Sequence, residues 1–447
     1  MPAPTIYRST DPGAPVLMGV GGSLVDVLTA CLVDGYGGSF ATGVITNDGV
    51  LLTDGDTVTI GSITYTYRTS LTGQPAYAFT GATVAGMLGS LVNAINGNGI
   101  VGTNYSAGTL AHPDAYTTTV SVPAPIAISS RRAGTPGNSI ALSENSTHLT
   151  VSGANLTGGS GSITKTGAGW TRPFTGAGGQ AVYRPPAGSR FYLQVDDTGP
   201  GGGGARDARN FGWENATAWN TGTGQFPTAA QATAGSVIRK SSTLDATARA
   251  WTLLVDDRTF YLFTYSGDSA GLAHGFSFGD FYSFLPGDLY KCLIMGGSSE
   301  SGSLVTSTQF FQHPTVGLAI SHAGHWLPRN YSGAGGSTVF LKAGDQATGA
   351  TTIAGTLGFP NPCDGGLYVA PLRIFDGSTP ASSITGTINM RGRLRGLYQA
   401  MHAVGSFADG DTFSGVGDYA GRNFMIVKGT QTGAFVAVET TAWDVST

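Results

Sequence analysis

The sequence predicts a mainly β protein of the α+β type, with an antiparallel β-sandwich-like host and a small inserted ββαββ domain. Three observations lead to this fold class. Glycine supplies 70 of the 447 residues, against an average of about 7%, which is typical of a chain with many turns. Segments in which polar and apolar residues alternate recur along the chain, and this period indicates strands. Apolar stripes with helical spacing are scarce after residue 166.

The composition also indicates which kind of molecule the protein binds. Apolar residues make up 40% of the chain and charged residues 11%, whereas about 25% charged residues is usual. A surface poor in charge resembles the buried part of protein interfaces, so we expect a protein that works inside an assembly. The formal net charge of −4 argues against nucleic acid as the main partner.

The cysteines and the lengths of the apolar runs indicate the cellular compartment of the protein. Cys31, Cys292 and Cys363 are an odd number at wide spacing, so we expect reduced, buried thiols, with neither a disulfide framework nor a zinc site. The first residues lack the apolar core of a signal peptide, and no run of 18 apolar residues occurs. We therefore expect synthesis in a cytoplasm and no membrane insertion.

The first predicted element is a helix over residues 23–34. Its apolar residues follow the i, i+3, i+4, i+7, i+8 pattern of one helix face. Ser23 suits the N-cap and Gly35 the position after the helix. The residues of the stripe are Leu24, Val27, Leu28, Cys31 and Leu32.

Residues 40–165 predict a compact module. Residues 56–67 alternate polar and apolar and predict a hairpin that turns at Gly61-Ser62. Thr83 is the predicted N-cap of a helix whose apolar face runs from Val84 to Ile95. Further strands are expected at 116–122, 139–144 and 148–152, and the glycine- and serine-rich residues 156–161 read as a linker.

We interpret this module as an insertion. The segment that stops at Tyr36-Gly37-Gly38 looks as if it continues directly at Gly169-Trp170-Thr171-Arg172-Pro173-Phe174. Domain insertions are tolerated at exposed loops between neighbouring elements. The alternative is a row of tandem domains. The expected organisation is an N-terminal part of the host at 1–39, the inserted module at 40–165, a β-rich host part at 166–330, and a C-terminal β-rich part or separate β domain at 331–447.

The host part predicts strands and little helix. Residues 191–195 form a strand pattern, and residues 251–263 form the clearest hairpin, with its turn at 256–259. Residues 229–240 are a weak helix candidate.

Thr198 to Gly224 contains a glycine run followed by two arginines, which raises the question of a phosphate-binding loop. The P-loop pattern needs a lysine after its last glycine, and Ala205 and Arg206 follow here instead. A dinucleotide fingerprint needs a helix after the glycines, and the residues that follow are aromatic and rich in Asn and Thr. We expect a structural or contact loop.

Gly267-Asp268-Ser269-Ala270-Gly271 matches the G-x-S-x-G pattern, and His274 lies close by. A nucleophile elbow requires a helix after the serine, but the glycine-broken aromatic residues 276–282 favour a strand. We expect a polar turn between two aromatic strands and no nucleophilic role for Ser269.

Two further patterns suggest metals. His322 and His325, with His313 upstream, have ligand spacing if they lie on a helix, but Gly324 weakens that helix. Asp196-Asp197 and Asp256-Asp257 follow strand ends, where calcium or a hairpin turn would use carboxylates. We favour the turn, and we assign no catalytic, cofactor-binding or metal-ligating residue and no cofactor.

Several long strings resemble a family of virion structural proteins of tailed bacteriophages, and the stretch between them resembles a module that recurs in such proteins. The resemblance covers nearly all of residues 1–38 and 166–447. The host strings are YRSTDPGAPVLMGVGGSLVDVLTACLVDGYG, GWTRPFTG, KSSTLDATARAWTLLVDDRTFYLFTY, GRLRGLYQ and FADGDTFSGVGDYAGRNFMIV; the module strings are DTVTIGSITYTY, LVNAIN, AHPD, AGTPGNSIAL and LTGGSGS.

The resemblance implies a non-enzymatic protein on the exterior of the virion, assembled in the bacterial host cytoplasm. It implies a tail-associated component, such as a minor tail protein, a fibre or part of the attachment apparatus. A capsid decoration or head-fibre protein is the alternative, and a virion-associated hydrolase a distant one. Implied partners are other tail or capsid proteins, further copies of the chain in a homo-oligomer, and a host cell-surface glycan.

Overall fold

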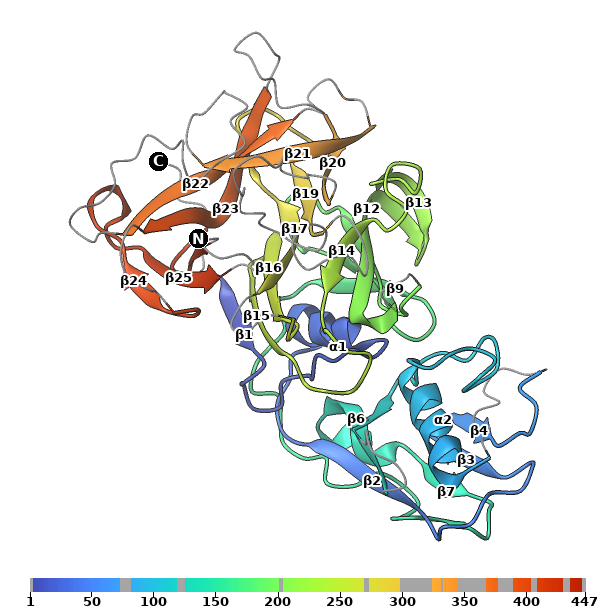
Figure 1. The fold of residues 1–447 in the computed structure, drawn as a ribbon. Helices are drawn as coiled ribbons and strands as arrows, with labels where there is room; N and C mark the ends of the chain where they lie inside the picture. The colour runs from blue at the N-terminus through green and yellow to red at the C-terminus, as the bar shows by residue number, and fades with distance from the viewer. Residues whose placement is uncertain are drawn as a thin grey trace.

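The computed structural model describes residues 3–72, 82–118, 125–200, 204–268, 273–297, 324–330, 333, 335–343, 367–376, 389–402, 408–428 and 435–443. In these ranges the protein is mainly β, and all pairs between its labelled strands are antiparallel, so the expected fold class is confirmed. Figure 1 shows two lobes, a small lobe made by the described residues between 40 and 160 and a large lobe made by the other described residues.

The large lobe is built on two sheets. The larger runs in the order β1-β15-β16-β17-β19-β20-β21-β22-β23-β26-β25-β24, with β18 paired to β23. Its strands are β1 (Thr5–Arg8), β15 (Ala250–Val255), β16 (Thr259–Tyr265), β17 (His274–Asp280), β18 (Tyr282–Ser283), β19 (Cys292–Met295), β20 (His325–Arg329), β21 (Gly335–Ala343), β22 (Leu367–Asp376), β23 (Asn389–His402), β24 (Thr412–Ser414), β25 (Asn423–Lys428) and β26 (Phe435–Glu439).

This sheet curls back on itself. β17 leads through Phe281 directly into β18, and β18 pairs with β23, which lies five strands further along the sheet. The two ends of the sheet therefore face each other, and β16 is covered on both sides. That burial explains why residues 260–263 read Phe-Tyr-Leu-Phe without polar alternation, since a strand buried on both faces needs apolar residues at every position.

The second sheet packs on the first across α1. Its order is β13-β12-β11-β10-β9, with β14 beside β12. Its strands are β9 (Thr171–Thr175), β10 (Gln180–Arg184), β11 (Tyr192–Asp196), β12 (Asp207–Ala218), β13 (Thr221–Phe226) and β14 (Ser236–Arg239).

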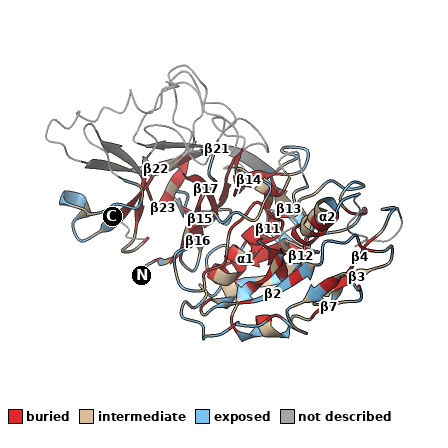
Figure 2. Cartoon of the chain, turned by 60° about the horizontal axis from the view of Figure 1, so that its bottom comes forward, coloured by how far each residue is buried: buried red, intermediate tan, exposed pale blue. Residues whose placement is uncertain are grey.

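The main core lies between these two sheets and α1. Leu28 of α1, Leu193 of β11 and Phe260 of β16 belong to one cluster of buried side chains. A second cluster fills the other face of β16, where Tyr261 meets Trp443 and side chains of β22, β23, β25 and β26. Figure 2 shows the buried residues gathered along α1 and the sheets.

The first predicted helix is present with a different start and end. α1 spans Ser23–Thr29 and continues as a π-helical turn over Ala30–Asp34, and Gly35 ends it with φ +79°. The predicted N-cap is wrong: the cap is Gly22, with φ +85°, because Ser23 is already inside the helix. The hydroxyl of Ser23 instead lies 2.8 Å from the carbonyl oxygen of Met18.

The small lobe contains two sheets and α2 (Val84–Asn96). Its hydrophobic cluster is formed by residues between Ala41 and Leu156 alone. One sheet has the order β5-β6-β2-β8 and the other β4-β3-β7. The strands are β2 (Phe40–Asn47), β3 (Thr57–Ile60), β4 (Ile63–Thr66), β5 (Ala115–Thr117), β6 (Ile126–Ala133), β7 (Leu142–Glu144) and β8 (Leu149–Val151).

Local predictions for this lobe are largely confirmed. β3 and β4 form the expected hairpin, and the Thr83 hydroxyl accepts a hydrogen bond from the Gly86 N–H at the start of α2. The ββαββ order is incomplete, because β2 and β6, which pair with each other, were not predicted. The strand expected at 139–144 is shorter, because Ser139 ends a 3-10 turn over Thr135–Ser139 and β7 spans Leu142–Glu144.

In the large lobe the hairpin of residues 251–263 and the strand at 191–195 are confirmed as β15–β16 and β11. The weak helix candidate at 229–240 is wrong, because its end forms β14, whose four residues are all buried. A strand there satisfies backbone groups against β12, and the tertiary pairing overrides a weak helical preference.

The chain enters and leaves the small lobe at one narrow neck. Tyr36 bridges Lys165, and the Ser39 N–H donates to the Ser160 carbonyl over 2.7 Å. The strand ends are thus adjacent, a geometry that an insertion requires. The boundaries of the inserted domain, 40 and 165, and the other domain limits stay predictions.

Candidate functional site

The G-x-S-x-G motif lies partly outside the described residues, which include Gly267 and Asp268 but not Ser269 to Gly271. His274 opens β17 and its Nε2 lies 3.0 Å from the hydroxyl of Ser266, not a residue that the sequence singled out. The Ser266 hydroxyl donates to Asp268 over 2.8 Å. A serine, a histidine and a carboxylate are therefore together in the turn between two aromatic strands.

This trio is a buried structural network. Ser266 and His274 are each 1% exposed, so a substrate has no access to the hydroxyl. Arg239 donates to both oxygens of Asp268 and also contacts Asp207. Burial raises the pKa of Asp268, but hydrogen bonds from His274 and Arg239 outweigh it and hold the pKa below its usual value. The carboxylate thus stays ionised and ties the turn to β12 and β14.

The predicted histidine pattern does not lie on a helix. His325 is the first residue of β20 and is buried, and His313 and His322 lie outside the described residues. Among the residues that the structure describes, no three His, Cys, Asp or Glu side chains gather where a metal ion could bind. The assignment of no metal and no cofactor stays a prediction.

The glycine run lies between β11 and β12. Residues 201–203 are outside the described part, and Gly204–Arg206 form a short 3-10 turn that leads directly into β12. A strand that the sequence did not predict follows the glycines, so the helix that a dinucleotide site needs is missing here.

The two acidic pairs serve different purposes. Asp256 accepts the backbone N–H of Arg258 and Thr259, which is the expected hairpin-turn role, and it also pairs with Arg395 of β23. Asp197, in contrast, points into the protein and lies 2.5 Å from the Nζ of Lys240. The sequence predicted neither the ion pair of Asp256 with Arg395 nor that of Asp197 with Lys240.

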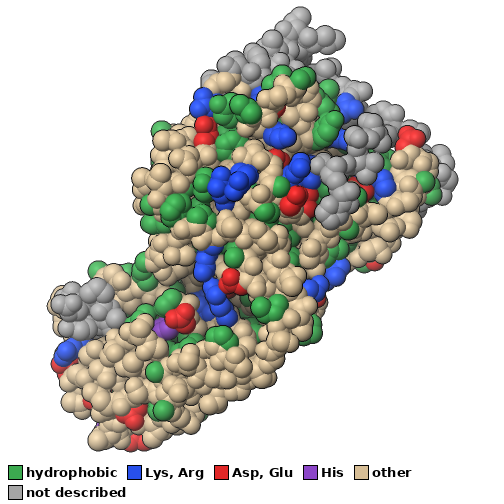
Figure 3. All heavy atoms as spheres, turned by 180° about the vertical axis from the view of Figure 1, so that it is seen from behind, with side chains coloured by type: hydrophobic (Ala, Val, Ile, Leu, Met, Phe, Trp, Pro, Cys, Tyr) green, Lys and Arg blue, Asp and Glu red, His purple; other side chains and the backbone are tan. Residues whose placement is uncertain are grey.

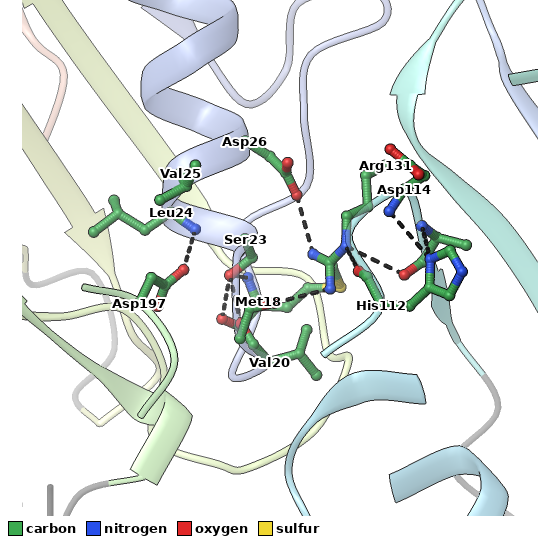
Figure 4. Close-up of polar contacts among 12 residues, drawn as sticks. Met18, Val20, Ser23, Leu24, Val25, Asp26, His112, Asp114, Arg131 and Asp197 are labelled. Atoms are coloured by element: carbon green, nitrogen blue, oxygen red, sulfur yellow. Dashed lines mark hydrogen bonds and ion pairs between the residues drawn. The ribbon is translucent and has the colours of Figure 1, made fainter. Parts of the chain in front are cut away.

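A cluster of polar contacts joins the two lobes (Figure 4). Arg131 at the end of β6 donates from Nη1 to Asp26 of α1 over 3.0 Å and from Nη2 to the Gly21 carbonyl over 2.8 Å. Its Nε donates to the carbonyls of His112 and Ala115. One guanidinium thus binds α1 of the large lobe and the residues at the start of β5 in the small lobe, and we call this cluster the Arg131 clamp.

The ion pair of the Arg131 clamp is largely buried. The Arg131 side chain is 2% exposed and the Asp26 side chain 14%. Burial raises the pKa of Asp26, and the charge of Arg131 counteracts this. A buried carboxylate of this kind is strongly destabilising once its partner is removed.

His112 completes the small-lobe side of the clamp. Its Nδ1 accepts the N–H groups of Asp114 and Ala115, and its Nε2 donates to the Ile60 carbonyl. These partners fix the neutral tautomer with the proton on Nε2. Burial, together with the charge of Arg131, lowers the pKa of His112, so the ring stays neutral.

A different kind of site lies on the surface of the large lobe. Five large apolar side chains around β18 and the start of β23 are exposed, and Leu289 reaches 74%. They are adjacent because Tyr282 pairs with Arg393, the Phe284 N–H donates to the Arg391 carbonyl, and the Tyr282 and Phe284 rings are 5.9 Å apart. We call them the β18 patch: Tyr282, Phe284, Leu285, Leu289 and Met390.

The patch is held rigidly from beneath. Arg391 donates from two nitrogens to the two oxygens of Asp288, each over 2.8 Å, and the Ser283 hydroxyl donates to the same carboxylate. The arginine and aspartate side chains are 3% and 2% exposed. A preformed apolar surface loses little conformational entropy when it binds.

Neither the Arg131 clamp nor the β18 patch was predicted from the sequence. Arg131 follows the apolar residues of β6 within a Ser-Ser-Arg-Arg run, which reads as a solvated strand end. A usable signal for the patch was present, since residues 281–290 combine aromatic and leucine side chains with turn residues.

No protein-family model and no curated protein matches this chain. In the described residues, no helix has the length and apolar character needed to cross a membrane.

Proposed function

We propose that the chain is a non-enzymatic structural component of a tailed-bacteriophage virion that assembles through the β18 patch with a second copy of itself. The observation that carries this proposal is the patch, because soluble monomers rarely expose large contiguous apolar surfaces without a partner. The low charge of the surface supports an assembled state as well. On the face shown in Figure 3, neutral side chains and backbone predominate over charged groups.

The location on the particle is proposed from the sequence resemblance alone. We favour the exterior of the tail, with the capsid exterior as the alternative. Burial of Ser266 and His274 supports a structural role over a hydrolase, because a nucleophile must be reachable by its substrate. The copy number per virion separates the locations: tail components occur in small multiples set by tail symmetry, and decoration proteins in far larger numbers.

The patch proposal is tested by changing two of its residues. Phe284→Asp with Leu289→Asp places charges in the proposed contact. We therefore expect the dissociation constant of the oligomer, measured by light scattering, to rise by at least about tenfold. Val416→Asp is the matched control, since Val416 is 83% exposed and lies outside the patch. A wild-type chain that is monomeric at high concentration, or an oligomer that the double variant leaves intact, would contradict the proposal.

A further inference from the structure

Asp197 and Lys240 are the most deeply buried ion pair in the described ranges, because both side chains have no exposed surface. Asp197 directly follows β11 and Lys240 directly follows β14. Two opposite full charges in such a place lose their hydration, and one ion pair seldom compensates for that loss. The pair therefore calls for a reason beyond stability.

The geometry of the pair is unusual for a salt bridge. Lys240 Nζ lies 2.5 Å from Asp197 Oδ1, yet Oδ1 has no hydrogen-bond partner. The other oxygen, Oδ2, accepts the Leu24 N–H over 2.7 Å. The amine and the carboxyl group are thus in contact without the alignment of a hydrogen bond.

Besides the carboxyl group of Asp197, two acceptors surround Nζ. Nζ donates to the Val20 carbonyl over 2.5 Å and to the Ser23 hydroxyl over 3.1 Å. A neutral amine has two N–H groups and one lone pair. With the two N–H groups directed at these acceptors, the lone pair is left for the carboxyl group of Asp197.

Burial also favours the uncharged forms of both groups. It raises the pKa of Asp197 to about 6, which the charge of Lys240 opposes, and it lowers the pKa of Lys240, which Asp197 opposes. The shifts have opposite directions and the same cause, the loss of water around a charge. Within this dry site, transfer of one proton from the ammonium group to the carboxylate gives an amine that faces a carboxylic acid.

We propose that Lys240 and Asp197 join in an intramolecular isopeptide bond. The Nζ lone pair attacks Cγ of the Asp197 carboxylic acid, and a C–N bond forms. One amine proton passes to the departing hydroxyl, the Cγ–Oδ1 bond breaks, and one water molecule leaves. No oxidant, reductant or cofactor is required.

Each neighbour has a place in this step. The oxygen that leaves is Oδ1, which has no hydrogen bond to lose. The oxygen that stays is Oδ2, and the Leu24 N–H that it accepts stabilises the negative charge that develops there during the attack. The fold holds the two groups in contact, so the reaction is intramolecular. It therefore avoids the entropy loss of bringing two separate molecules together.

The bond would tie the end of β11 to the end of β14, next to the start of α1. It also removes two buried charges, so the pair would contribute stability without the cost of desolvation. Such a cross-link suits a protein that bears load in a particle, although the chemistry itself does not depend on the proposed function.

The test is the intact mass of the purified full-length chain under denaturing conditions. We expect a mass one water below that of the sequence, and tandem mass spectrometry of a digest should identify one branched peptide linking Lys240 and Asp197. Lys240→Arg and Asp197→Ala should restore the full sequence mass. Asp197→Asn should give the same linked product, with ammonia as the leaving group.

The matched control is Lys165→Arg, because Lys165 lies 3.5 Å from Asp11 in a pair that is partly exposed. This variant should still be one water lighter than its sequence. A wild-type mass equal to that of the sequence would overturn the proposal and leave an ordinary ion pair. A water loss mapped to another site, such as a succinimide at Asp54-Gly55, would overturn it equally. The wild-type result decides even if the Lys240 variant fails to fold.

Discussion

Arg131 and Arg132 are neighbours in the sequence with opposite surroundings. Arg131 is buried and binds Asp26 and three backbone carbonyls. Arg132 pairs with Asp34 at the surface, where the two side chains are 55% and 41% exposed. An ion pair in water contributes little, whereas a buried carboxylate without its partner is costly.

We therefore predict that Arg131→Ala lowers the free energy of unfolding by about 3–5 kcal/mol. Arg132→Ala, the matched control, should lower it by less than about 1 kcal/mol. Urea unfolding followed by tryptophan fluorescence measures both. Equal effects of the two variants would show that the Arg131 clamp does not join the lobes as described.

His112 predicts a dependence of stability on pH. Its pKa is lowered in the folded protein, whereas the unfolded chain takes up the proton near pH 6.5. The unfolded state thus binds more protons below that pH, so stability falls as the pH falls towards the folded-state pKa of His112. Protonation of Nδ1 would also break its two backbone hydrogen bonds.

We expect the wild-type protein to lose stability between pH 7.5 and pH 5, and His112→Gln, which does not titrate, to lose less over the same range. The measurement is the free energy of unfolding in urea at several pH values. Other titrating groups are common to both proteins and cancel in the difference. Parallel profiles would remove His112 as the cause.

At the scale of elements, the start of α1 depends on a residue from elsewhere. Gly22 occupies the N-cap and has no side chain, so the Leu24 N–H is bound by Asp197, 173 positions away. A local cap normally supplies this acceptor. The first turn of the helix is therefore capped only when the end of β11 has brought the carboxyl group of Asp197 next to it.

The neck between the lobes depends on glycine. Gly38 has φ +80°, and a Cβ there would overlap the carbonyl oxygen of Ser160 on the opposite strand. Gly49 has a similar φ of +93° but has open space around it. The two positions separate the cost of backbone conformation from the cost of close packing.

Gly49→Ala should cost about 1–2 kcal/mol, the conformational penalty of a left-handed residue. Gly38→Ala should cost clearly more, because the strands at the neck must also move apart. Thermal unfolding of the two variants gives the comparison, and amide exchange at Ser39 and Ser160 reports on the neck itself. A Gly38 variant as stable as the Gly49 variant would contradict close packing there.

At the scale of the whole molecule, the small lobe has its own hydrophobic cluster but shares the Arg131 clamp with the large lobe. Removing the small lobe takes Arg131 away from Asp26 of α1 and leaves that carboxylate without its ion-pair partner. We expect the large lobe alone to be more stable when that charge is also removed.

We predict that replacing residues 40–159 by a short glycine linker gives a folded large lobe in the Asp26→Asn background. The same deletion with Asp26 retained should be markedly less stable. Circular dichroism and thermal unfolding of the two deletions test this. Failure of both to fold would argue against residues 40–165 being an insertion.

The sequence by itself determined the fold class, the β3–β4 and β15–β16 hairpins and the position of α2. Each of these follows from the period of apolar residues and from local capping or turn chemistry, which a short window contains. It also indicated that residues 267–282 form a turn and a strand, not a nucleophile elbow, and β17 confirms the strand.

The tertiary structure alone decided which charges are buried and with what. Asp26 and Arg131 are 105 positions apart, and Leu24 and Asp197 are 173 apart. A polar residue at a strand or helix end reads as solvated from the sequence, because its neighbours in the chain say nothing about an element that arrives from elsewhere. The path of the chain through the neck, and the curling of the large sheet, bring these partners together.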